Sequence, residues 1–395
     1  MTPERSSAQP TTQPTDQPTA NLAPVTASSL PPRRLLVAAS GTGGHLFPAL
    51  AIAARLATEG STDGTPWEIE WLGVRDRMET ELVGDRYPLH YVPVSGLQGG
   101  LLDAFKALIG LGISLWQCYR LLDRFDAVLT TGGYIAAPAI LAARLRGLPT
   151  ILHESNALPG KVTRACGRWC HTLAVGFAEA ADRLEAPRIL HVGTPVRAEF
   201  LTPIGLDLAI PDGVPVIAVM GGSQGAVAVN RMVRECLPRW LDAGAWVVHL
   251  TGDNDPDADS IQHAHYISLP FYHNIAGLLQ RSTLAISRAG AGAVTELSVS
   301  GTPAILIPFP FAAEDHQFYN GQIFVNAGAA RMYRQEDLDA ERLAIEVVEL
   351  LNNPESFAQM RQGMASLAVT DSVDRLVGAI DAAIVSSVVP LATFN

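Results

Sequence analysis

Three glycine clusters, each placed directly after a run of apolar, strand-type residues, most constrain how this chain can fold. They span Gly41–His45, Thr131–Tyr134 and Gly221–Gly225. A glycine turn between a buried parallel strand and a helix lets the backbone approach a ligand closely, and it directs free N–H groups and the positive helix end at an anion. Two clusters in the first half of the chain and one opening the second half predict an α/β protein with two nucleotide-fold domains that face a shared cleft.

Composition supports this fold class and narrows the partners. The chain has 395 residues, of which 48% are hydrophobic and 17% charged. This length exceeds one ordinary core, and the apolar content suits parallel sheets covered by helices on both faces. The net charge of −11 argues against nucleic acid as the main partner. Four unpatterned cysteines indicate reduced thiols in a cytosolic protein, and Cys166 and Cys170 fit a helical core better than a metal site.

Turn signals and apolar periodicity predict the domain boundaries. Residues 1–33, rich in Thr, Pro, Gln and Ser, predict a disordered tail. Alternating strands and helices then predict an N-terminal domain over 34–200 and a C-terminal domain over 215–370, joined by a linker over 201–214. A final helix is expected within 371–395.

The expected elements share apolar runs bounded by Gly, Pro, Asn or Asp. Strands are expected at 34–40, 67–73, 89–94, 126–130, 149–153, 216–220, 246–250, 265–269, 284–287 and 304–307. Helices are expected at 46–57, 101–123, 135–145, 161–168, 226–241, 274–280, 292–300, 317–327, 341–351, 355–367 and 373–388.

The first glycine cluster carries a histidine at the place where open α/β sheets bind ligands. It is not Gly-x-Gly-x-x-Gly, because Leu46 stands at the third glycine position, and no lysine follows in P-loop spacing. A tight strand–helix turn accounts for the glycines. His45 at the carboxyl end of the first strand can also take a proton from a substrate hydroxyl, and the residues alone leave both readings open.

Other polar groups follow later strands. The run His153–Asn156 is hard to bury unless it binds something, although a capped loop is the alternative. Ser223 can cap a helix, bind a phosphate oxygen, or do both. Small residues over 287–295 leave room for a diphosphate, while Glu296 can either complement the helix dipole or accept two ribose hydroxyls. Amide groups over 315–320 suit sugar recognition or an ordinary helix start.

Two further stretches have competing interpretations. The acidic run Asp253–Asp259 fails as a calcium loop, because Ala258 stands where glycine is needed and no Glu follows at position twelve. It therefore predicts a solvated acidic loop and no metal. An apolar stripe at helical spacing fits core burial on the sequence alone, with an interfacial surface as the alternative. Its members are Leu102, Phe105, Leu108, Ile109, Ile113 and Trp116.

Several motifs in order along the chain, from about Arg34 to about Ala330, resemble those of the MurG family of glycosyltransferases, of the family 28 type. These motifs are the three glycine clusters, His153–Asn156, Thr194–Arg197 and Arg288–Glu296. The resemblance implies a GT-B fold of two Rossmann-like, doubly wound domains facing a cleft, the first binding the acceptor and facing the membrane. It implies that the last helix returns to the N-terminal domain.

The resemblance also implies an activity. This is inverting transfer of N-acetylglucosamine (GlcNAc) from UDP-GlcNAc to the C4 hydroxyl of N-acetylmuramic acid (MurNAc) in lipid I, undecaprenyl-diphosphate-MurNAc-pentapeptide, which yields lipid II for peptidoglycan. No metal, cofactor or nucleic acid is implied. The implied partners are UDP-GlcNAc, lipid I, the membrane surface and other cell-wall synthesis proteins. The implied location is peripheral, on the cytoplasmic face of the cell (inner) membrane, where the apolar stripe would make the contact.

Carried over by position, the resemblance implies His45 as the candidate base, a ribose contact for Glu296 and a backbone contact to uracil for Tyr272. The residues implied to contact UDP-GlcNAc are Thr42, Gly43, Gly44, Asn156, Arg197, Ser223, Tyr272, Ala291, Gly292, Ala293, Val294, Thr295, Glu296 and Gln317. The residues implied to contact the acceptor are His45, Tyr134, His153 and Glu154.

The chain departs from the family pattern at two positions. Ser155 replaces the usual Gln, and Thr194 replaces the usual Asn, which puts the hydrogen bonds near Arg197 in question. The rival functions are a related transferase with another lipid acceptor, such as a galactosyl-diacylglycerol synthase, a UDP-GlcNAc 2-epimerase, and a non-catalytic nucleotide-sugar binder. A dinucleotide dehydrogenase is disfavoured, because Gly-x-Gly-x-x-Gly is absent and Glu70 lies inside its strand rather than at the end.

Overall fold

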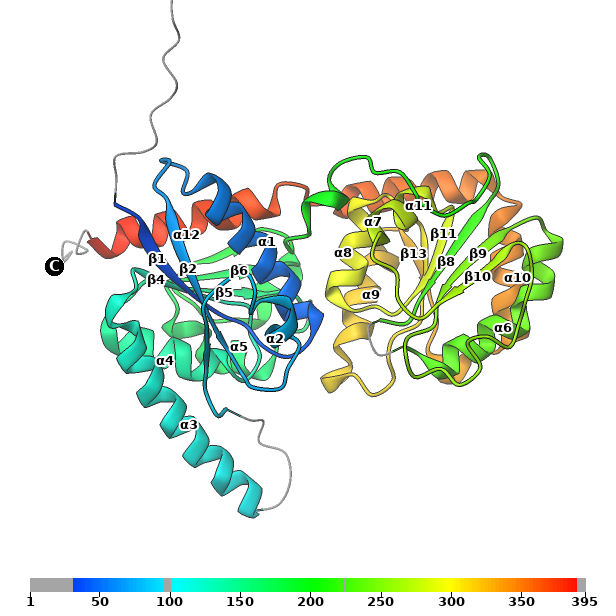
Figure 1. Cartoon of the computed structure of the whole chain (residues 1–395). Coiled ribbons are helices and arrows are strands. Elements are labelled where there is room, and N and C mark those ends of the chain that lie inside the picture. The colour runs from blue at the N-terminus through cyan, green and yellow to red at the C-terminus, as the bar shows by residue number, and fades with distance from the viewer. Residues whose placement is uncertain (1–30, 95–100, 223–224, 389–395) are drawn as a thin grey trace, which may run out of the picture.

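Two parallel sheets, each covered by helices on both faces, form the two halves of the protein (Figure 1). A computed structural model describes residues 31–94, 101–222 and 225–388. The predicted tail over 1–33 therefore lies almost wholly outside the described residues. The expected fold class, two doubly wound Rossmann-like domains, is confirmed.

The N-terminal sheet has seven parallel strands. Its order is β3 (Leu89–Tyr91), β2 (Trp67–Gly73), β1 (Arg33–Ala38), β4 (Ala127–Thr130), β5 (Thr150–Glu154), β6 (Thr172–Val175) and β7 (Ile189–His191). Alternation along β1 directs Leu35 and Val37 to one face and Leu36 and Ala38 to the other, and all four are fully buried. Strands buried on both faces read as continuous apolar runs, which is why the sequence predicts them well.

Helices cover both faces of this sheet. On one face lie α1 (Gly43–Glu59) and α12 (Ser372–Val388), and on the other α3 (Leu101–Leu121), α4 (Ala136–Arg146) and α5 (Lys161–Cys166); α2 (Glu79–Leu82) is a single turn after β2. The packing of α12 involves Leu376, Val377 and Ile380, which lie in one cluster with side chains of β1 and α1. Asp381 fastens it by accepting hydrogen bonds from the Ser61 hydroxyl (2.7 Å) and the Thr62 amide (2.9 Å).

The C-terminal sheet has six parallel strands. Its order is β10 (Tyr266–Leu269), β9 (Trp246–Leu250), β8 (Val216–Met220), β11 (Leu284–Ser287), β12 (Ala304–Leu306) and β13 (Ala330–Met332). Its helices are α6 (Val227–Asp242), α7 (Ile275–Arg281), α8 (Ala291–Val299), α9 (His316–Asn326), α10 (Ala340–Leu351) and α11 (Pro354–Leu367). Short 3₁₀ turns lie at Leu122–Arg124, Gly167–Trp169, Ala178–Arg183, Ala198–Phe200, Ala313–Asp315 and Gln335–Asp337.

The sequence prediction missed the short elements and extended several strands too far, since those expected over 34–40 and 304–307 end at Ala38 and Leu306. β6, β7, β13 and α2 were not expected, and the strand expected over 89–94 ends at Tyr91. Each of these elements has three or four residues, too few for a periodic pattern. The segment between Phe200 and Val216 contains no helix or strand, but Leu206, Leu208 and Ile210 pack against the C-terminal core, so it is a fixed connection.

Candidate active site

His45 lies at the point where the strand order of the N-terminal sheet reverses, between β1 and β4. Its Nδ1 is 2.6 Å from the backbone oxygen of Thr131, in the loop after β4. A carbonyl oxygen can only accept, so Nδ1 carries the proton and Nε2 keeps a free lone pair. The Thr131 hydroxyl donates back to the His45 backbone oxygen at 2.8 Å. The ring is thus held in the tautomer that a general base requires.

Glycines next to this histidine give the loop backbone conformations that residues with a side chain rarely adopt. Gly132 and Gly133 both have positive φ (94° and 74°), and a Cβ at Gly132 would lie 3.4 Å from the imidazole Cε1 of His45. A Cβ at Gly43 would lie 2.7 Å from the Phe47 ring. Thr42 and Gly44 are exposed beside them.

A buried carboxylate that the sequence did not point to supports the first glycine loop. Glu79 of α2 is fully buried. It accepts hydrogen bonds from the Ser40 hydroxyl (2.5 Å), the Val74 amide (2.8 Å) and the Gly41 amide (3.3 Å). It therefore ties the loop after β2 to the loop that leads to His45. Nothing near Glu79 in the sequence marks this role, because Ser40 and Gly41 lie almost forty residues earlier in the chain, after the neighbouring strand β1.

The His153–Asn156 run is largely occupied by bonds within the protein. His153 is fully buried and its Nε2 donates to the Gly193 oxygen at 2.9 Å, and burial lowers its pKa. Glu154 accepts from the Asn156 amide (2.9 Å) and side chain (3.1 Å), the Gly160 amide (2.9 Å) and the Thr163 hydroxyl (2.6 Å). Four donors fill the lone pairs of a carboxylate. The structure therefore gives both residues internal partners. It also occupies both ends of the partly exposed Asn156 side chain, whose NH₂ group donates to Glu154 and whose oxygen accepts from Asn320 at 3.1 Å.

The second domain contributes a helix N-terminus. α8 begins after Gly290 without a side-chain cap, so the N–H groups of its first turn remain free for an anion. Gly292 and Ala293 are partly exposed there, whereas Ala291 and Val294 are buried. The Thr295 hydroxyl is not free, since it donates to the backbone oxygen of Ala291 at 2.8 Å.

Glu296 and Arg197 meet where the two domains adjoin. Their closest atoms are 3.9 Å apart, and the Arg197 guanidinium also lies over the Phe47 ring of α1, at 5.4 Å from its centroid. Burial raises the pKa of Glu296 to about 7, the positive charge of Arg197 opposes this shift, and Glu199 adds to it. The structure thus brings together α1, the loop after β7 and α8.

Gln317, at the start of α9, points towards the beginning of α8. Its side-chain oxygen accepts from the Phe309 amide at 2.9 Å, and a Cβ at Gly290 would lie 3.9 Å from its Nε2. The fixed oxygen leaves the NH₂ group as the free donor. Asn320, one turn later, is fully buried and accepts from the Ala157 amide of the other domain at 2.9 Å.

The remaining predicted residues are placed as follows. Tyr134 is 49% exposed in the loop after β4. The Tyr272 side chain is buried and donates to Asp207, which leaves only its backbone for a ligand. Ser223 lies outside the described residues. The hydroxyl of Thr194 is buried with no hydrogen-bond partner among the described residues.

The prediction of a solvated acidic loop over 253–259 is wrong for Asp255. This carboxylate is buried and pairs with Arg234 of α6 at 2.8 and 3.1 Å, and it also accepts from the Asn230 side chain at 2.6 Å. The sequence could not show this, because the cationic partner lies on a helix about twenty residues earlier. Across the described ranges, no group of three or more His, Cys, Asp or Glu residues is arranged to hold a metal ion.

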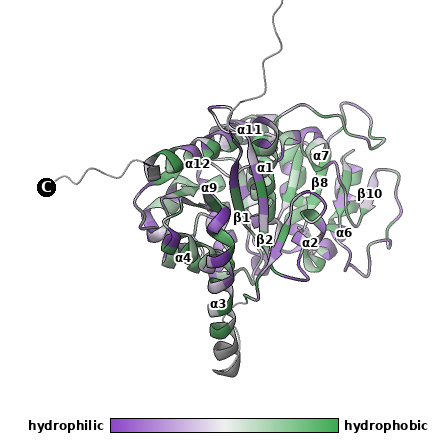
Figure 2. Cartoon of the chain, turned by 60° about the vertical axis from the view of Figure 1, so that its left-hand side comes forward, coloured by the Kyte–Doolittle hydropathy of each residue, from purple (hydrophilic) through white to green (hydrophobic). Residues whose placement is uncertain are grey.

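The prediction of core burial for the apolar stripe is also wrong. α3 projects from the body of the protein (Figures 1 and 2), and Leu108, Ile109, Ile113 and Trp116 are between 45% and 62% exposed. The side chains of Leu102 and Phe105 lie outside the described residues. Within the described part of the chain, no helix combines the length and apolar character needed to cross a membrane.

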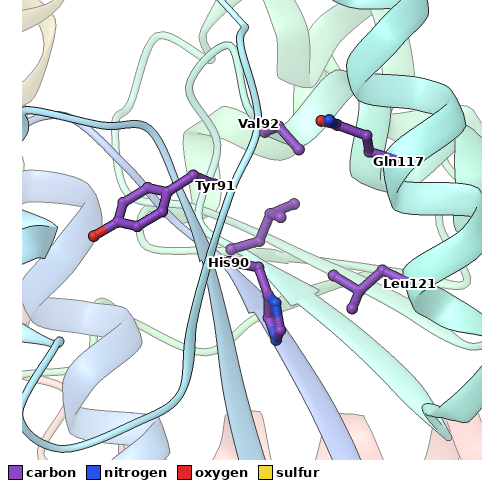
Figure 3. A pocket seen from close by; sticks show the side chains of 6 residues that line it. His90, Tyr91, Val92, Gln117 and Leu121 are labelled. Atoms are coloured by element: carbon purple, nitrogen blue, oxygen red, sulfur yellow. The ribbon is translucent and has the colours of Figure 1, made fainter.

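An open cavity of about 230 Å³ lies beside the C-terminal half of α3 (Figure 3). None of its lining side chains is a predicted site residue. Its polar wall includes His90, whose Nε2 is 2.6 Å from Glu70, and Gln117, whose side-chain oxygen is buried without a partner in the described part. The cavity thus separates α3 from the edge strand β3 and is distinct from the site at His45.

Comparison with known proteins agrees with this arrangement. Residues 35–175 match the glycosyltransferase family 28 N-terminal domain, and residues 216–376 match the glycosyltransferase family 28 C-terminal domain. A protein of Gloeothece citriformis is 56% identical over 87% of this chain and 94% of its own length, and one of Nostoc sp. is 56% identical over 87% and 96%. Both are named UDP-N-acetylglucosamine–N-acetylmuramyl-(pentapeptide) pyrophosphoryl-undecaprenol N-acetylglucosamine transferase.

Solved structures show the same fold. MurG of Acinetobacter baumannii superposes with a TM-score of 0.72 at 28% identity, covering 89% of this chain and all of that one. The calicheamicin glycosyltransferase CalG4 superposes with a TM-score of 0.68 at 14% identity, covering 92% of this chain and all of that one, which shows likeness of fold alone. The two matched domains, together with relatives that are 56% identical over 87% of the chain, establish that the chain belongs to glycosyltransferase family 28 and, within it, to the MurG family.

Proposed function

We propose that this protein transfers GlcNAc from UDP-GlcNAc to the C4 hydroxyl of MurNAc in undecaprenyl-diphosphate-MurNAc-pentapeptide, converting lipid I to lipid II. The names of its relatives describe this transferase. The observation that carries the chemistry is the placement of His45. Its Nε2 lone pair is free because Nδ1–H is bound to the Thr131 oxygen, and it stands at the carboxyl ends of the strands, where open α/β sheets bind ligands.

The reaction follows from this tautomer. Nε2 of His45 takes the proton of the acceptor C4 hydroxyl as the oxygen attacks the anomeric carbon of GlcNAc. The bond between that carbon and the β-phosphate oxygen breaks, and UDP leaves with the electron pair. Because the attack and the departure occur on opposite sides, the configuration inverts. Nothing in this step requires a carboxylate nucleophile.

The leaving group develops negative charge, and two features are suited to stabilise it. The uncapped start of α8 presents free N–H groups, and the guanidinium of Arg197 lies near Glu296 at the domain boundary. The N–H groups and the guanidinium would each stabilise the negative charge of a diphosphate. Glu296 would accept the two ribose hydroxyls, and the backbone of Tyr272 would meet uracil. The residues proposed to surround the donor sugar and diphosphate are Thr42, Gly43, Gly44, Asn156, Ser223, Gly292, Ala293, Thr295 and Gln317.

The acceptor side lies in the N-terminal domain. Tyr134 is exposed in the loop beside His45 and would face the acceptor diphosphate. His153 and Glu154 are bound internally, so we assign them the support of that surface rather than direct contact. The exposed apolar side chains of α3 would lie in the membrane interface, where the polyprenyl chain of the acceptor is anchored. We therefore propose a peripheral location, on the cytoplasmic face of the membrane.

The test is an assay of UDP release. The purified full chain is incubated with UDP-GlcNAc or UDP-galactose, with and without a short-chain lipid I analogue. Release that requires both UDP-GlcNAc and the analogue supports the proposal. Release with UDP-galactose and a diacylglycerol acceptor, or conversion of the sugar without any acceptor, would contradict it and would indicate a different transferase or an epimerase, respectively.

A further inference from the structure

Two segments from different domains form a closed ring of polar contacts. On the N-terminal side, Glu154 fixes the loop that follows β5, and the Pro159 oxygen of that loop accepts from Arg164 Nη1 at 2.7 Å. The same arginine reaches the C-terminal domain, where its Nη2 donates to both carboxylate oxygens of Glu314, at 2.8 and 2.9 Å. Asn320 closes the ring through the Ala157 amide at 2.9 Å.

The C-terminal part of this ring has an unusual backbone. Glu314 and Asp315 are consecutive non-glycine residues in the left-handed region, with φ of 52° and 57°. Side chains with a Cβ adopt this region rarely, and they do so only where the surroundings hold them there. Each of the two carboxylates has an arginine partner, Arg164 for Glu314 and Arg334 for Asp315 (2.7 Å). One of these partners belongs to the other domain.

The position of Gln317 depends on this turn. α9 begins at His316, directly after Asp315, so the two left-handed residues set the direction in which the first turn of the helix presents its side chains. Gln317 is oriented by the Phe309 amide, which belongs to the same C-terminal loop. Asn320 fixes the next turn of α9 against the N-terminal domain, with its NH₂ group 3.1 Å from the Asn156 oxygen.

We propose that Arg164 is a positioning residue for recognition of the donor sugar. Through Glu314 it holds the left-handed turn that places Gln317, so the sugar is recognised only when the two domains are in contact. The inference rests on the proposed role of Gln317 in the transfer reaction. An exposed ion pair such as Arg164–Glu314 contributes little to overall stability. We therefore attribute its role to holding the turn at Glu314 and Asp315.

The test compares binding of UDP-GlcNAc and UDP to the full chain by titration calorimetry. Arg164→Ala is expected to weaken UDP-GlcNAc binding about fivefold, the upper range for one exposed ion pair, and to change UDP binding less than twofold. Arg168→Ala is the matched control, because Arg168 is exposed in the neighbouring turn and lies over Trp169; it should leave both affinities unchanged. Glu314→Gln should weaken UDP-GlcNAc binding as Arg164→Ala does, and combining the two should add no further loss.

Three outcomes would overturn the inference. They are an unchanged affinity for UDP-GlcNAc in Arg164→Ala, an equal loss of affinity for UDP and UDP-GlcNAc, and losses in the double variant that simply add. Thermal unfolding of each variant separates a loss of fold from a loss of positioning, and a variant with wild-type unfolding and an unchanged ratio counts against the proposal. The binding ratio is independent of transfer to lipid I. A protein that binds UDP-GlcNAc but transfers nothing would therefore refute the proposed function while still testing the role of Arg164.

Discussion

The imidazole of His45 is held by the backbone oxygen of Thr131, 2.6 Å from Nδ1, and this contact joins the first turn of α1 to the loop after β4. This hydrogen bond matters for the chemistry, because it keeps the proton on Nδ1 and leaves Nε2 free to accept one. We expect His45→Ala to lower kcat by roughly 10²- to 10⁴-fold, the usual contribution of a general base, and to change KM for UDP-GlcNAc little. Steady-state kinetics with the lipid I analogue measure both. His263→Ala, an exposed histidine of the other domain, is the control, and an unchanged kcat in His45→Ala would refute the assignment.

Glu296 should make both ligand binding and stability depend on pH. Its pKa is raised from 4.5 to about 7, so the folded protein holds a proton there that the unfolded chain has released. The free energy of unfolding therefore falls as pH rises from about 4.5 to 7. Glu296→Gln should abolish this fall, which is on the order of 1–3 kcal/mol. Urea unfolding of the ligand-free protein at pH 5 and pH 8 measures it.

The same carboxyl should control nucleotide affinity in the opposite sense. Acceptance of two ribose hydroxyls requires the ionised form, so UDP binding should strengthen as pH rises through about 7 in the wild type. In Glu296→Gln the affinity should be weaker and flat over that range. A wild-type affinity that does not vary between pH 6 and pH 8 would contradict the ribose contact.

Asn320 should be important for stability. It is fully buried and satisfies the Ala157 amide across the domain boundary. Asn320→Ala leaves that amide without a partner, and we expect a loss of about 1–3 kcal/mol. Asn326→Ala, which removes an exposed side chain on the same helix that accepts a hydrogen bond from Gln322, should cost much less. Equal losses in the two variants would show that the interdomain bond contributes nothing special.

Asp255 should behave as a structural residue and not as a metal ligand. Replacing it with Ala leaves Arg234 buried without its partner, which typically costs about 3–5 kcal/mol. Asp253→Ala, an exposed residue of the same run, should be neutral. Chemical denaturation compares the two. Transfer activity that is lost on chelation and restored by a divalent cation would contradict this interpretation of the acidic run.

The exposed face of α3 should bind lipid. Leu108→Ser combined with Trp116→Ser removes two large apolar side chains from this face, and we expect sedimentation with phosphatidylethanolamine–phosphatidylglycerol vesicles to fall at least tenfold, since each contributes roughly 1.5–3 kcal/mol when buried. Leu145→Ser, which alters an exposed leucine of α4, is the control. Equal vesicle binding by all three proteins would remove α3 from the membrane contact.

The sequence predicts well whatever depends on local pattern. The strands at 67–73, 246–250 and 284–287 begin and end in the structure where they were expected, because apolar runs bounded by turn residues are a local signal. The identity of His45 as a candidate base also came from a local motif at a strand end.

What the sequence did not predict depends on distant partners. Glu79 contacts the loop that leads to His45, some forty residues away along the chain, and Asp255 is buried by an arginine on another element. The left-handed backbone of Glu314 and Asp315 could not be predicted either, since neither residue is glycine and their arginine partners, Arg164 and Arg334, lie on other segments of the chain. These groups come together only in the folded protein, so no local sequence motif predicts their contacts.

The return of α12 to the first domain has a consequence for biosynthesis. The N-terminal sheet cannot complete its core until Leu376, Val377 and Ile380 have been made, although its strands leave the ribosome first. At usual synthesis rates of about 5–20 residues per second, the apolar face that α12 will cover stays open while the whole second domain is translated. The last helix therefore delays completion of the first domain's core until the second domain has been synthesised.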